Sequence, residues 1–330
     1  MKLFEKLEAK NISFNNRIIM PPMATAKADE NGHVSQDILD YYNEKTKDKI
    51  FSTVIVEHNY IDPLGKASHN QMSIADDSSI DGLKKLAKTI KDNGSNAIGQ
   101  ISHAGSAASE DVIGASPLGP SSVKNPSKKD AELPRELTIN QIKEIEDKFA
   151  DAALRVKKAG FDGVEIHSAH GYFLDQFLSP LTNKRSDEYG KDIDGRIKIH
   201  LEIIKKVREK VGENYPIFLR LGAGDNLDGG LTKEDSVYAA KAFEKAGIDV
   251  LDISGGMCMY FTDNQYAGFF DYLSKPIYDA VDIPVILTGG VKTARDIEEI
   301  LNRDVCDLVG VGRAVFKDSK WIEKEVKPLI

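Results

Sequence analysis

The sequence predicts a single-domain (β/α)₈ barrel, the TIM-barrel fold, over residues 1–330, and two observations support this prediction. The first is an alternation of short apolar runs with longer amphipathic stretches. The runs are continuous rather than alternating, as expected for strands buried on both faces of a parallel sheet. Eight of them occur, at 17–20, 53–56, 97–101, 163–167, 217–221, 250–253, 285–287 and 308–311. Eight strands separated by helices favour a closed barrel, with an open doubly wound sheet as the alternative.

The second observation is a weak internal sequence repeat, which we call the internal echo. The segments KKAGFDGVEIH (157–167) and EKAGIDVLDIS (244–254) share the order helix end, Ala-Gly, turn and strand. The segment KDNGSNAIGQIS (91–102) is a weaker copy. Recurrent units of this kind imply parallel strands joined by right-handed crossovers.

The stretches between the runs predict helices. In 138–156 the apolar residues recur at spacings of three and four, which is typical of an amphipathic helix. Thr138 and Gln141 have the spacing of a capping box, and Gly160 stands where a C-terminal glycine belongs. Two further helix starts are predicted at Thr232 and Thr293, because each threonine is followed three residues later by aspartate.

Composition narrows the class of protein. The net charge of −8 gives no basic surplus for nucleic acid or an anionic membrane. No run reaches the roughly 18 apolar residues of a membrane span, and the first residues lack an apolar signal core, so we expect a cytoplasmic protein. Cys258 and Cys306 are too few for a disulfide framework or for the roughly four ligands of an iron–sulfur cluster within one chain. A homo-oligomer is compatible with the sequence, which leaves the oligomeric state open.

The segment 105–137 is the largest interruption and is rich in Gly, Ser, Pro and Lys. It follows the third predicted strand, on the face where barrel active sites form. Loops of this length are usually functional or disordered. Composition does not separate an active-site loop over the substrate from a solvated insertion.

Glycines follow the last two predicted strands. Gly289, Gly290 and Gly312 stand where many barrels bind phosphate through backbone N–H groups, and Arg313 adds a cation. Simple turns are the alternative interpretation. No Gly-x-Gly-x-x-Gly motif opens a helix after a strand, and no Walker-type loop occurs.

Two histidines and a tyrosine, His167, His170 and Tyr172, follow the fourth predicted strand. Two imidazole N–H groups aimed at one oxygen would stabilise an enolate-like transition state, and a nearby tyrosine could deliver a proton. A metal site is the alternative, but no well-placed third and fourth ligand is present, so the sequence predicts none.

Polar residues also stand within predicted strands. Arg220 ends a buried strand and therefore needs an anionic partner, which is either a ligand or an internal acid such as Glu165 or Asp252. Gln100 could offer one donor and one acceptor to a planar heterocycle.

The run HSAHGYFLDQFLSPLTNKRSDEYG (167–190) closely resembles the old yellow enzyme family of FMN-containing NAD(P)H oxidoreductases. So do NRIIMPPM (16–23), QISHAG (100–105) and LVGVGR (308–313). The similarity extends over essentially the whole chain. It is greatest to the branch that includes bacterial ene-reductases and the catalytic barrel of bacterial dienoyl-CoA reductases.

The resemblance implies a set of roles. FMN would be the cofactor, with NADH or NADPH as hydride donor. The cofactor-binding residues would be Pro22, Met23 and Ala24 along the flavin ring, His58 beside it, Gln100 and Arg220 at its polar edge, and Gly289, Gly290, Gly312 and Arg313 at its phosphate. The catalytic residues would be His167 and His170, which bind the substrate carbonyl oxygen, and Tyr172, which protonates carbon.

The mechanism implied is ping-pong reduction of an activated C=C bond in a small enone or enoyl substrate. The alternatives are an NAD(P)H:flavin or quinone reductase or NADH oxidase with a non-alkene acceptor, a barrel that binds FMN without catalysis, and a flavin-free phosphate-binding lyase or isomerase. Ala24 departs from the family, because many relatives carry Thr or Cys there to hydrogen-bond flavin O4. This departure predicts a lower flavin reduction potential. His58 stands where many relatives carry a small residue, which predicts altered surroundings of the flavin.

Overall fold

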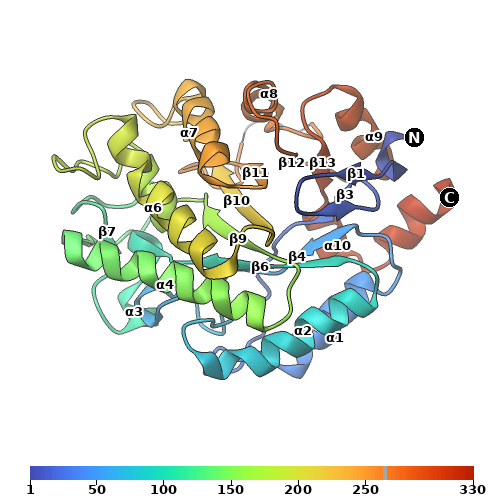
Figure 1. Cartoon of the computed structure of the whole chain (residues 1–330), viewed down its shortest axis with the longest axis horizontal. Helices are drawn as coiled ribbons and strands as arrows, with labels where there is room; N and C mark the ends of the chain where they lie inside the picture. The colour runs from blue at the N-terminus through green and yellow to red at the C-terminus, as the bar shows by residue number, and fades with distance from the viewer. Residues whose placement is uncertain (263–265) are drawn as a thin grey trace.

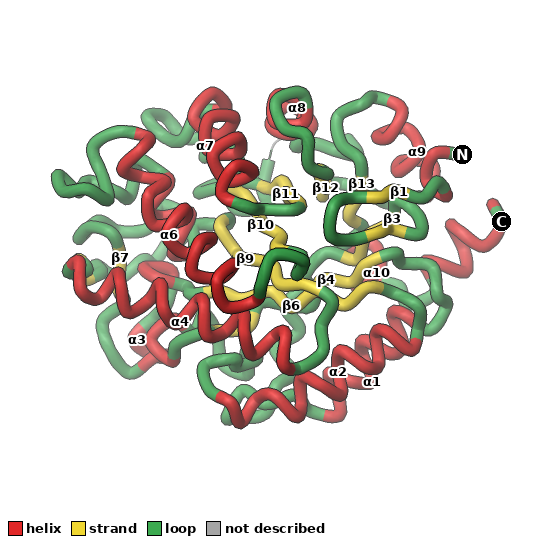
Figure 2. The backbone as a smooth tube through the Cα atoms, viewed as in Figure 1, coloured by secondary structure: helices red, strands yellow, loops and turns green. Residues whose placement is uncertain are grey.

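The computed structural model describes residues 1–262 and 266–330 and forms a closed barrel of parallel strands surrounded by helices (Figures 1 and 2). The barrel strands are, in chain order, β3 (Ile18–Met20), β4 (Thr53–Ile55), β6 (Asn96–Ser102), β9 (Gly163–Ser168), β10 (Ile217–Gly222), β11 (Val250–Ser254), β12 (Val285–Thr288) and β13 (Leu308–Gly310). The pairing of β4 with β6 closes the ring, which excludes the open doubly wound sheet. All eight predicted strand positions are confirmed.

Each barrel strand is followed by a helix on the outside. These helices are α1 (Gln36–Thr46), α2 (Ile80–Asp92), α4 (Ile139–Lys158), α6 (Ile193–Val211), α7 (Lys233–Ala246), α8 (Asp271–Tyr278), α9 (Ala294–Asn302) and α10 (Arg313–Lys317). Shorter elements decorate the loops: β1 (Leu7–Glu8), β2 (Ser13–Phe14), β5 (Asn59–Tyr60), α3 (Glu110–Ile113), β7 (Leu118–Gly119), β8 (Arg135–Glu136) and α5 (Phe173–Leu178).

The predicted helix starts are confirmed. The Thr138 side chain accepts from the backbone N–H of Gln141, in a complete capping box. The Thr293 side chain caps α9 in a complete capping box with Asp296, and the Thr232 side chain caps α7 by accepting from the backbone N–H of Asp235. At the other end of α4, Gly160 adopts a φ of +81°, a left-handed conformation that costs glycine no steric strain.

The internal echo corresponds to a repeated hydrogen bond. Asp162 Oδ2 accepts from the backbone N–H of Ala97 at 2.9 Å, and Asp249 Oδ2 accepts from that of Ile217 at 2.8 Å. Each aspartate precedes one strand and holds the start of the strand before it. The turn that follows each Ala-Gly therefore also sets how adjacent strands begin.

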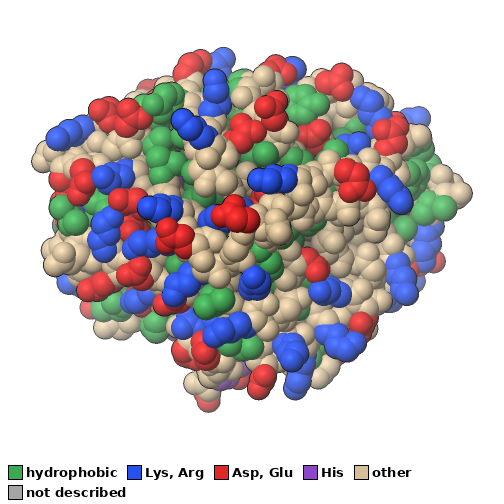
Figure 3. All heavy atoms as spheres, in the orientation of Figure 1, with side chains coloured by type: hydrophobic (Ala, Val, Ile, Leu, Met, Phe, Trp, Pro, Cys, Tyr) green, Lys and Arg blue, Asp and Glu red, His purple; other side chains and the backbone are tan. Residues whose placement is uncertain are grey.

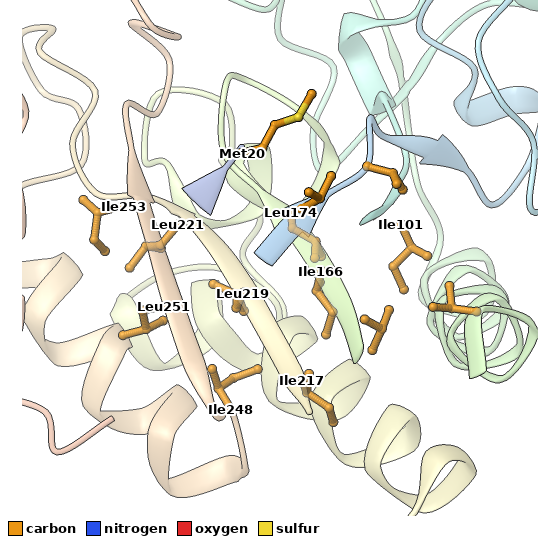
Figure 4. Packing of buried hydrophobic residues seen from close by; sticks show 14 of the residues in the cluster. Met20, Ile101, Ile166, Leu174, Ile217, Leu219, Leu221, Ile248, Leu251 and Ile253 are labelled. Atoms are coloured by element: carbon orange, nitrogen blue, oxygen red, sulfur yellow. The ribbon is translucent and has the colours of Figure 1, made fainter. Parts of the chain in front are cut away.

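Side chains alternate between the two faces of every barrel strand. Ile217, Leu219 and Leu221 of β10 face outward and pack with the helices (Figure 4). Inside, seven of the eight strands contribute one residue to an apolar layer, namely Ile19, Ile55, Ile98, Phe218, Val250, Ile286 and Leu308. The antiparallel β1–β2 hairpin adds Ile12 and Phe14 to this layer, with the Phe14 ring 6.5 Å from that of Phe218. The hairpin thus plugs the N-terminal end of the barrel.

The surface carries charged side chains of both signs, spread over the face seen in Figure 3. Within residues 1–262 and 266–330, none of the helices combines the length and apolar character needed to cross a bilayer.

Candidate functional site

A layer of polar side chains lies above the apolar layer, toward the C-terminal ends of the strands. Strand alternation turns every second residue inward, so the residues two positions after the apolar layer also face the interior. In β9, a Cβ at Gly163 would lie 2.9 Å from Ile98 Cδ1, which shows that Gly163, and with it Glu165, faces inward. We call this set the polar layer; it comprises Gln100, Glu165, Arg220, Asp252 and Thr288, on the successive strands β6, β9, β10, β11 and β12.

Two contacts connect the polar layer. Gln100 lies opposite Glu165 in the strand register, and its Nε2 donates to Glu165 Oε1 at 2.7 Å. Arg220 lies opposite Asp252, and its NH1 is 3.0 Å from Asp252 Oδ2. The sequence left open whether the partner of Arg220 is a ligand or an internal acid, and the internal ion pair with Asp252 is present.

The polar layer keeps unused hydrogen-bonding capacity. Arg220 Nε, Glu165 Oε2 and Thr288 Oγ1 are buried and have no hydrogen-bond partner in the described part of the chain. Burial raises the pKa of Glu165 well above its ordinary value, and the nearby Asp252 carboxyl adds to this increase. Burial also raises the pKa of Asp252 to about 6, although the Arg220 guanidinium opposes it. Buried groups left without partners are costly, so this layer is suited to receive a polar ligand.

His167, His170 and Tyr172 meet at the carboxyl end of β9. The His167 ring centroid lies 5.2 Å from that of His170 and 5.0 Å from that of Tyr172. His58, which follows β4, joins them, with its ring 5.6 Å from Tyr172 and 6.4 Å from His167. The structure therefore brings together the three predicted catalytic residues and one predicted cofactor-binding residue.

A tight turn positions this group. His170 has a φ of +61° and Gly171 a φ of +68°, so the chain reverses directly after β9. The Asp175 carboxylate fixes the turn by accepting from the Gly171 N–H at 2.7 Å. A left-handed histidine is uncommon and marks a site where surrounding contacts impose the conformation.

Burial keeps the site groups uncharged. It lowers the pKa of His167 and of His170 well below 6.5, and the charge of Arg220 adds to the decrease for both rings. Burial likewise lowers the pKa of His58 to about 4 and raises that of Tyr172 to about 12. At neutral pH the site holds neutral imidazoles and a protonated phenol.

Ser254, at the end of β11, is a site residue that the sequence analysis missed. His170 Nε2 lies 2.7 Å from Ser254 Oγ, whereas His167 Nδ1 is buried without a partner among the described residues. The internal echo contained the signal, because it aligns Ser254 with His167 and Asp252 with Glu165. The two repeated segments thus place polar side chains at equivalent positions of β9 and β11: Glu165 and Asp252 in one pair, His167 and Ser254 in the other.

If His170 binds the substrate carbonyl, as the resemblance implies, replacing Ser254 with alanine should slow turnover about 5-fold, because loss of one hydrogen bond of about 1 kcal/mol lets the His170 ring turn away. The rate of substrate-dependent flavin reoxidation measures this effect. The Ser254→Thr variant keeps the hydroxyl and should restore most of the rate. Equal rates for the alanine variant and the wild type would show that Ser254 does not orient His170.

The loop after β3 carries Pro22, Met23 and Ala24 along the barrel mouth. Ala24 is exposed, and Pro22 and Met23 are half-buried. The neighbouring Thr25 directs its hydroxyl to Glu57 Oε1 at 2.6 Å and its backbone N–H to Glu57 Oε2 at 2.8 Å. Thr25 is therefore engaged with Glu57, and Ala24 itself offers no side-chain donor to a ligand.

The glycines after β12 and β13 lie in adjacent loops, because these two strands pair directly. Gly290 has a φ of +69°, and a Cβ there would lie 2.5 Å from the Tyr266 carbonyl oxygen. A Cβ at Gly312 would lie 3.0 Å from Met23 Sδ. Arg313 is exposed, stacks 5.9 Å from the Phe269 ring centroid and forms no ion pair with a described residue. The two loops thus combine closely packed backbone with Arg313, a cation that is not paired with any described acid.

The segment 105–137 packs on the histidine turn. Asn125 Nδ2 donates to the Gly171 carbonyl at 2.8 Å and to Ser106 Oγ at 3.1 Å. The Ser106 N–H donates to Gln176 Oε1 at 2.9 Å, which ties the start of the segment to α5. These contacts hold part of the segment against the histidine turn.

A separate cavity of about 660 Å³ opens at the opposite end of the barrel, beside the β1–β2 hairpin. Its lining includes Lys10, Arg208, Glu244 and Asp282, so it carries charges of both signs. Barrel enzymes place their chemistry at the other end. The candidate site is therefore the barrel mouth.

Comparison with known proteins agrees with this geometry. The chain is 40% identical over 329 residues to an NADH oxidase of Thermoanaerobacter brockii, covering 98% of this chain but 50% of that protein. It is 35% identical to an NADPH dehydrogenase of Clostridium acetobutylicum, covering 98% of this chain and 94% of the relative. The chain thus spans about half the length of the first relative and nearly all of the second.

Solved structures show the same fold. A 2-naphthoyl-CoA reductase in complex with 2-naphthoyl-CoA superposes with a TM-score of 0.91 at 28% identity, covering 98% of this chain and 52% of that chain. An old yellow enzyme homologue from Zymomonas mobilis superposes with a TM-score of 0.85 at 24% identity, covering 98% and 93%. The expected resemblance and the predicted barrel are both confirmed.

The family model for NADH:flavin oxidoreductases and NADH oxidases, whose cofactor is FMN, matches residues 2–329. This chain therefore belongs to the NADH:flavin oxidoreductase / NADH oxidase family.

Proposed function

We propose that this protein is an ene-reductase, which takes reducing equivalents from NAD(P)H and reduces the activated C=C bond of an α,β-unsaturated carbonyl compound. One observation carries the proposal: neutral His167 and His170 meet protonated Tyr172 directly above the polar layer. Neutral imidazoles can donate hydrogen bonds to a carbonyl oxygen, and the phenol can supply a proton.

The residues at the barrel mouth fit FMN. Arg220 Nε and Thr288 Oγ1 are buried donors without partners in the described residues, as expected where a polar heterocycle binds. Gly289, Gly290 and Gly312 let backbone N–H groups approach a phosphate, and Arg313 forms no ion pair with the residues that the structure describes. We assign Pro22, Met23, Ala24 and His58 to the faces of the flavin ring, and Gln100 and Arg220 to its polar edge. When bound, FMN supplies hydride transfer, which the side chains of this chain cannot perform.

The protein residues would bind, orient and protonate. His167 and His170 hold the substrate carbonyl and stabilise the charge that develops on its oxygen. Tyr172, whose pKa burial raises to about 12, keeps its proton until a strongly basic carbon forms. The 105–137 segment holds this turn in place through the hydrogen bond from Asn125 to the Gly171 carbonyl, and it would cover the substrate. NAD(P)H and substrate would occupy the same mouth in turn, which is a ping-pong order.

The structure in complex with 2-naphthoyl-CoA supports a conjugated carbonyl as the substrate class, since that ligand is an aromatic acyl thioester. An NADH oxidase or quinone reductase is the second candidate, favoured by the 40% identity to an NADH oxidase. The two candidate activities would use the same flavin and differ only in the electron acceptor.

An absorbance spectrum of the purified protein followed by anaerobic reoxidation tests the proposal. We expect a flavin band, and we expect the reduced protein to be reoxidised fastest by enones or dienoyl thioesters in a panel that also contains quinones and oxygen. Fastest turnover with oxygen or quinones would favour the second candidate. A colourless protein that does not bind added FMN would contradict both.

The loop residue Ala24 provides a further prediction. Replacing Ala24 with Cys or Thr should raise the flavin reduction potential, because a new hydrogen bond to flavin O4 would stabilise the more electron-rich reduced state. A bond that favours this state by about 1 kcal/mol corresponds to about 20 mV for a two-electron couple. Redox titration measures the shift, with Ala24→Val as a control that adds bulk without a donor. Equal potentials in all variants would refute the prediction.

A further inference from the structure

The polar layer contains more buried acid than base. Glu165 and Asp252 are fully buried and Arg220 is 4% exposed, so one guanidinium lies among two carboxyl groups. With both acids ionised, the cluster would carry a net charge of −1 in the barrel interior, where an uncompensated charge is strongly unfavourable.

Hydrogen bonds do not compensate for this excess. Glu165 accepts a single bond, from Gln100 Nε2 to Oε1, and its Oε2 has no partner in residues 1–262 and 266–330. Neither oxygen of Asp252 accepts a hydrogen bond there, and Oδ2 only approaches Arg220 NH1 at 3.0 Å. One proton held by the two acids would remove the excess charge.

We propose that Glu165 and Asp252 form a redox-linked proton site, which takes up a proton from solvent when the flavin at the barrel mouth is reduced and releases it on reoxidation. This inference rests on the proposed binding of FMN beside Arg220. Reduction adds negative charge to the flavin, and Arg220 then has to balance that charge as well as Asp252. A unit charge about 6 Å away, at an effective dielectric constant of about 20, strengthens proton binding on the order of 100-fold.

The step balances in atoms and electrons. NAD(P)H loses two electrons and one proton to the flavin as hydride. The additional proton comes from solvent and forms an O–H bond with a carboxylate oxygen of the pair. No bond in the protein breaks, and the proton returns to solvent when the substrate removes the electrons.

The other groups that face the pair do not take this role. Gln100 and Thr288 flank it on β6 and β12 and do not titrate. Glu57, after β4, is buried, but its two oxygens accept two hydrogen bonds from Thr25. The imidazoles of His58, His167 and His170 face the mouth and are neutral, and the positive charge of Arg220 lowers the pKa of each.

Burial of the two carboxyl groups supports a proton uptake near neutral pH. The pKa of Asp252 is raised to about 6, so this carboxyl is mostly ionised at pH 7 before reduction. Burial and the nearby Asp252 carboxyl raise the pKa of Glu165 well above its ordinary value, so we assign to Glu165 the one proton that balances the charge of the cluster before reduction. A moderate increase in proton affinity on reduction would therefore change the charge of Asp252 near neutral pH.

The test is the number of protons taken up per two electrons, obtained from the pH dependence of the flavin midpoint potential of the holoprotein between pH 6.5 and 8. We expect more than one proton per two electrons in the wild type. In the isosteric variant Asp252→Asn we expect one, because the carboxyl that titrates is gone. The variant Glu165→Gln replaces a protonated carboxyl with a neutral isostere and should keep the wild-type number. The control is Glu146→Gln, which removes a buried acid of α4 outside the barrel and should leave the wild-type number unchanged.

The outcomes separate this inference from the proposed function. Flavin-loaded wild type that takes up a single proton would overturn the proton site and leave FMN binding intact. So would a flavin-loaded Asp252→Asn variant that keeps the wild-type number, or a Glu165→Gln variant that takes up a single proton. If one variant does not fold, the wild type and the other variant still decide. A wild-type protein without flavin absorbance would overturn both.

Discussion

Replacing both His167 and His170 with alanine should slow enone reduction by about 10³-fold, while FMN binding and flavin reduction by NAD(P)H stay near wild-type levels. Removal of one donor to a developing oxyanion typically costs about 10²–10³-fold in rate. The two rings lie 5.2 Å apart and would serve one oxygen, so their losses should not multiply. Stopped-flow measurement of each half-reaction, with 2-cyclohexenone as the oxidant, separates the two effects.

The matched control is His33→Ala, which removes a partly exposed histidine that lies 3.6 Å from the Asp29 carboxylate. It should leave both half-reactions unchanged. An unchanged rate of reoxidation by enone in the double variant would contradict the assigned role of the imidazoles. It would also revive the interpretation of the barrel as a flavin-binding protein that does not act on enones.

The pH dependence of the same half-reaction follows from burial. Because the pKa values of His167 and His170 lie well below 6.5 and that of Tyr172 is raised to about 12, none of these groups should titrate between pH 7 and 9. In the Asp252→Asn variant, which lacks the carboxyl of the proposed proton site, reoxidation by enone should therefore be flat over this range. A bell-shaped profile centred there would show that an imidazole or the phenol ionises during turnover.

The barrel strands were predictable because burial on both faces makes each of them a continuous apolar run. The ends of α4, α7 and α9 were predictable because Thr138, Thr232 and Thr293 satisfy free backbone N–H groups by local bonds. Such features depend on residues within one turn of each other, and they can be read directly from sequence.

The interior of the barrel was less predictable, because it depends on register between strands. The sequence placed polar residues in the strands, but only the pairing of β10 with β11 selects Asp252 as the partner of Arg220. Ser254 was missed because a serine after a strand has no distinctive pattern of its own. The β1–β2 hairpin was missed because its strands are two residues long.

The register of β10 with β11 places Arg220 beside Asp252, and we expect the largest effect on stability from replacing this arginine. Replacing Arg220 with methionine should lower the free energy of unfolding by about 3–5 kcal/mol at pH 8, because it leaves the Asp252 carboxylate buried without its cation. The control is Arg303→Met, which breaks a partly exposed ion pair with Asp271 and should cost about 0–1 kcal/mol. Urea denaturation of all three proteins at saturating FMN measures the differences.

The loss of stability caused by Arg220→Met should depend on pH, and the direction of this dependence follows from the raised pKa values of Glu165 and Asp252. Both carboxyl groups have a folded-state pKa above the unfolded value of about 4, so folding favours their protonated forms and stability falls as pH rises through the folded-state pKa. For Asp252 that pKa is about 6 with Arg220 present, and it should be higher without it. The penalty of Arg220→Met should therefore be smallest near pH 5, where Asp252 is protonated in both proteins, and should grow up to pH 8. An equal penalty at both pH values would mean that lost packing, rather than uncompensated charge, accounts for the destabilisation.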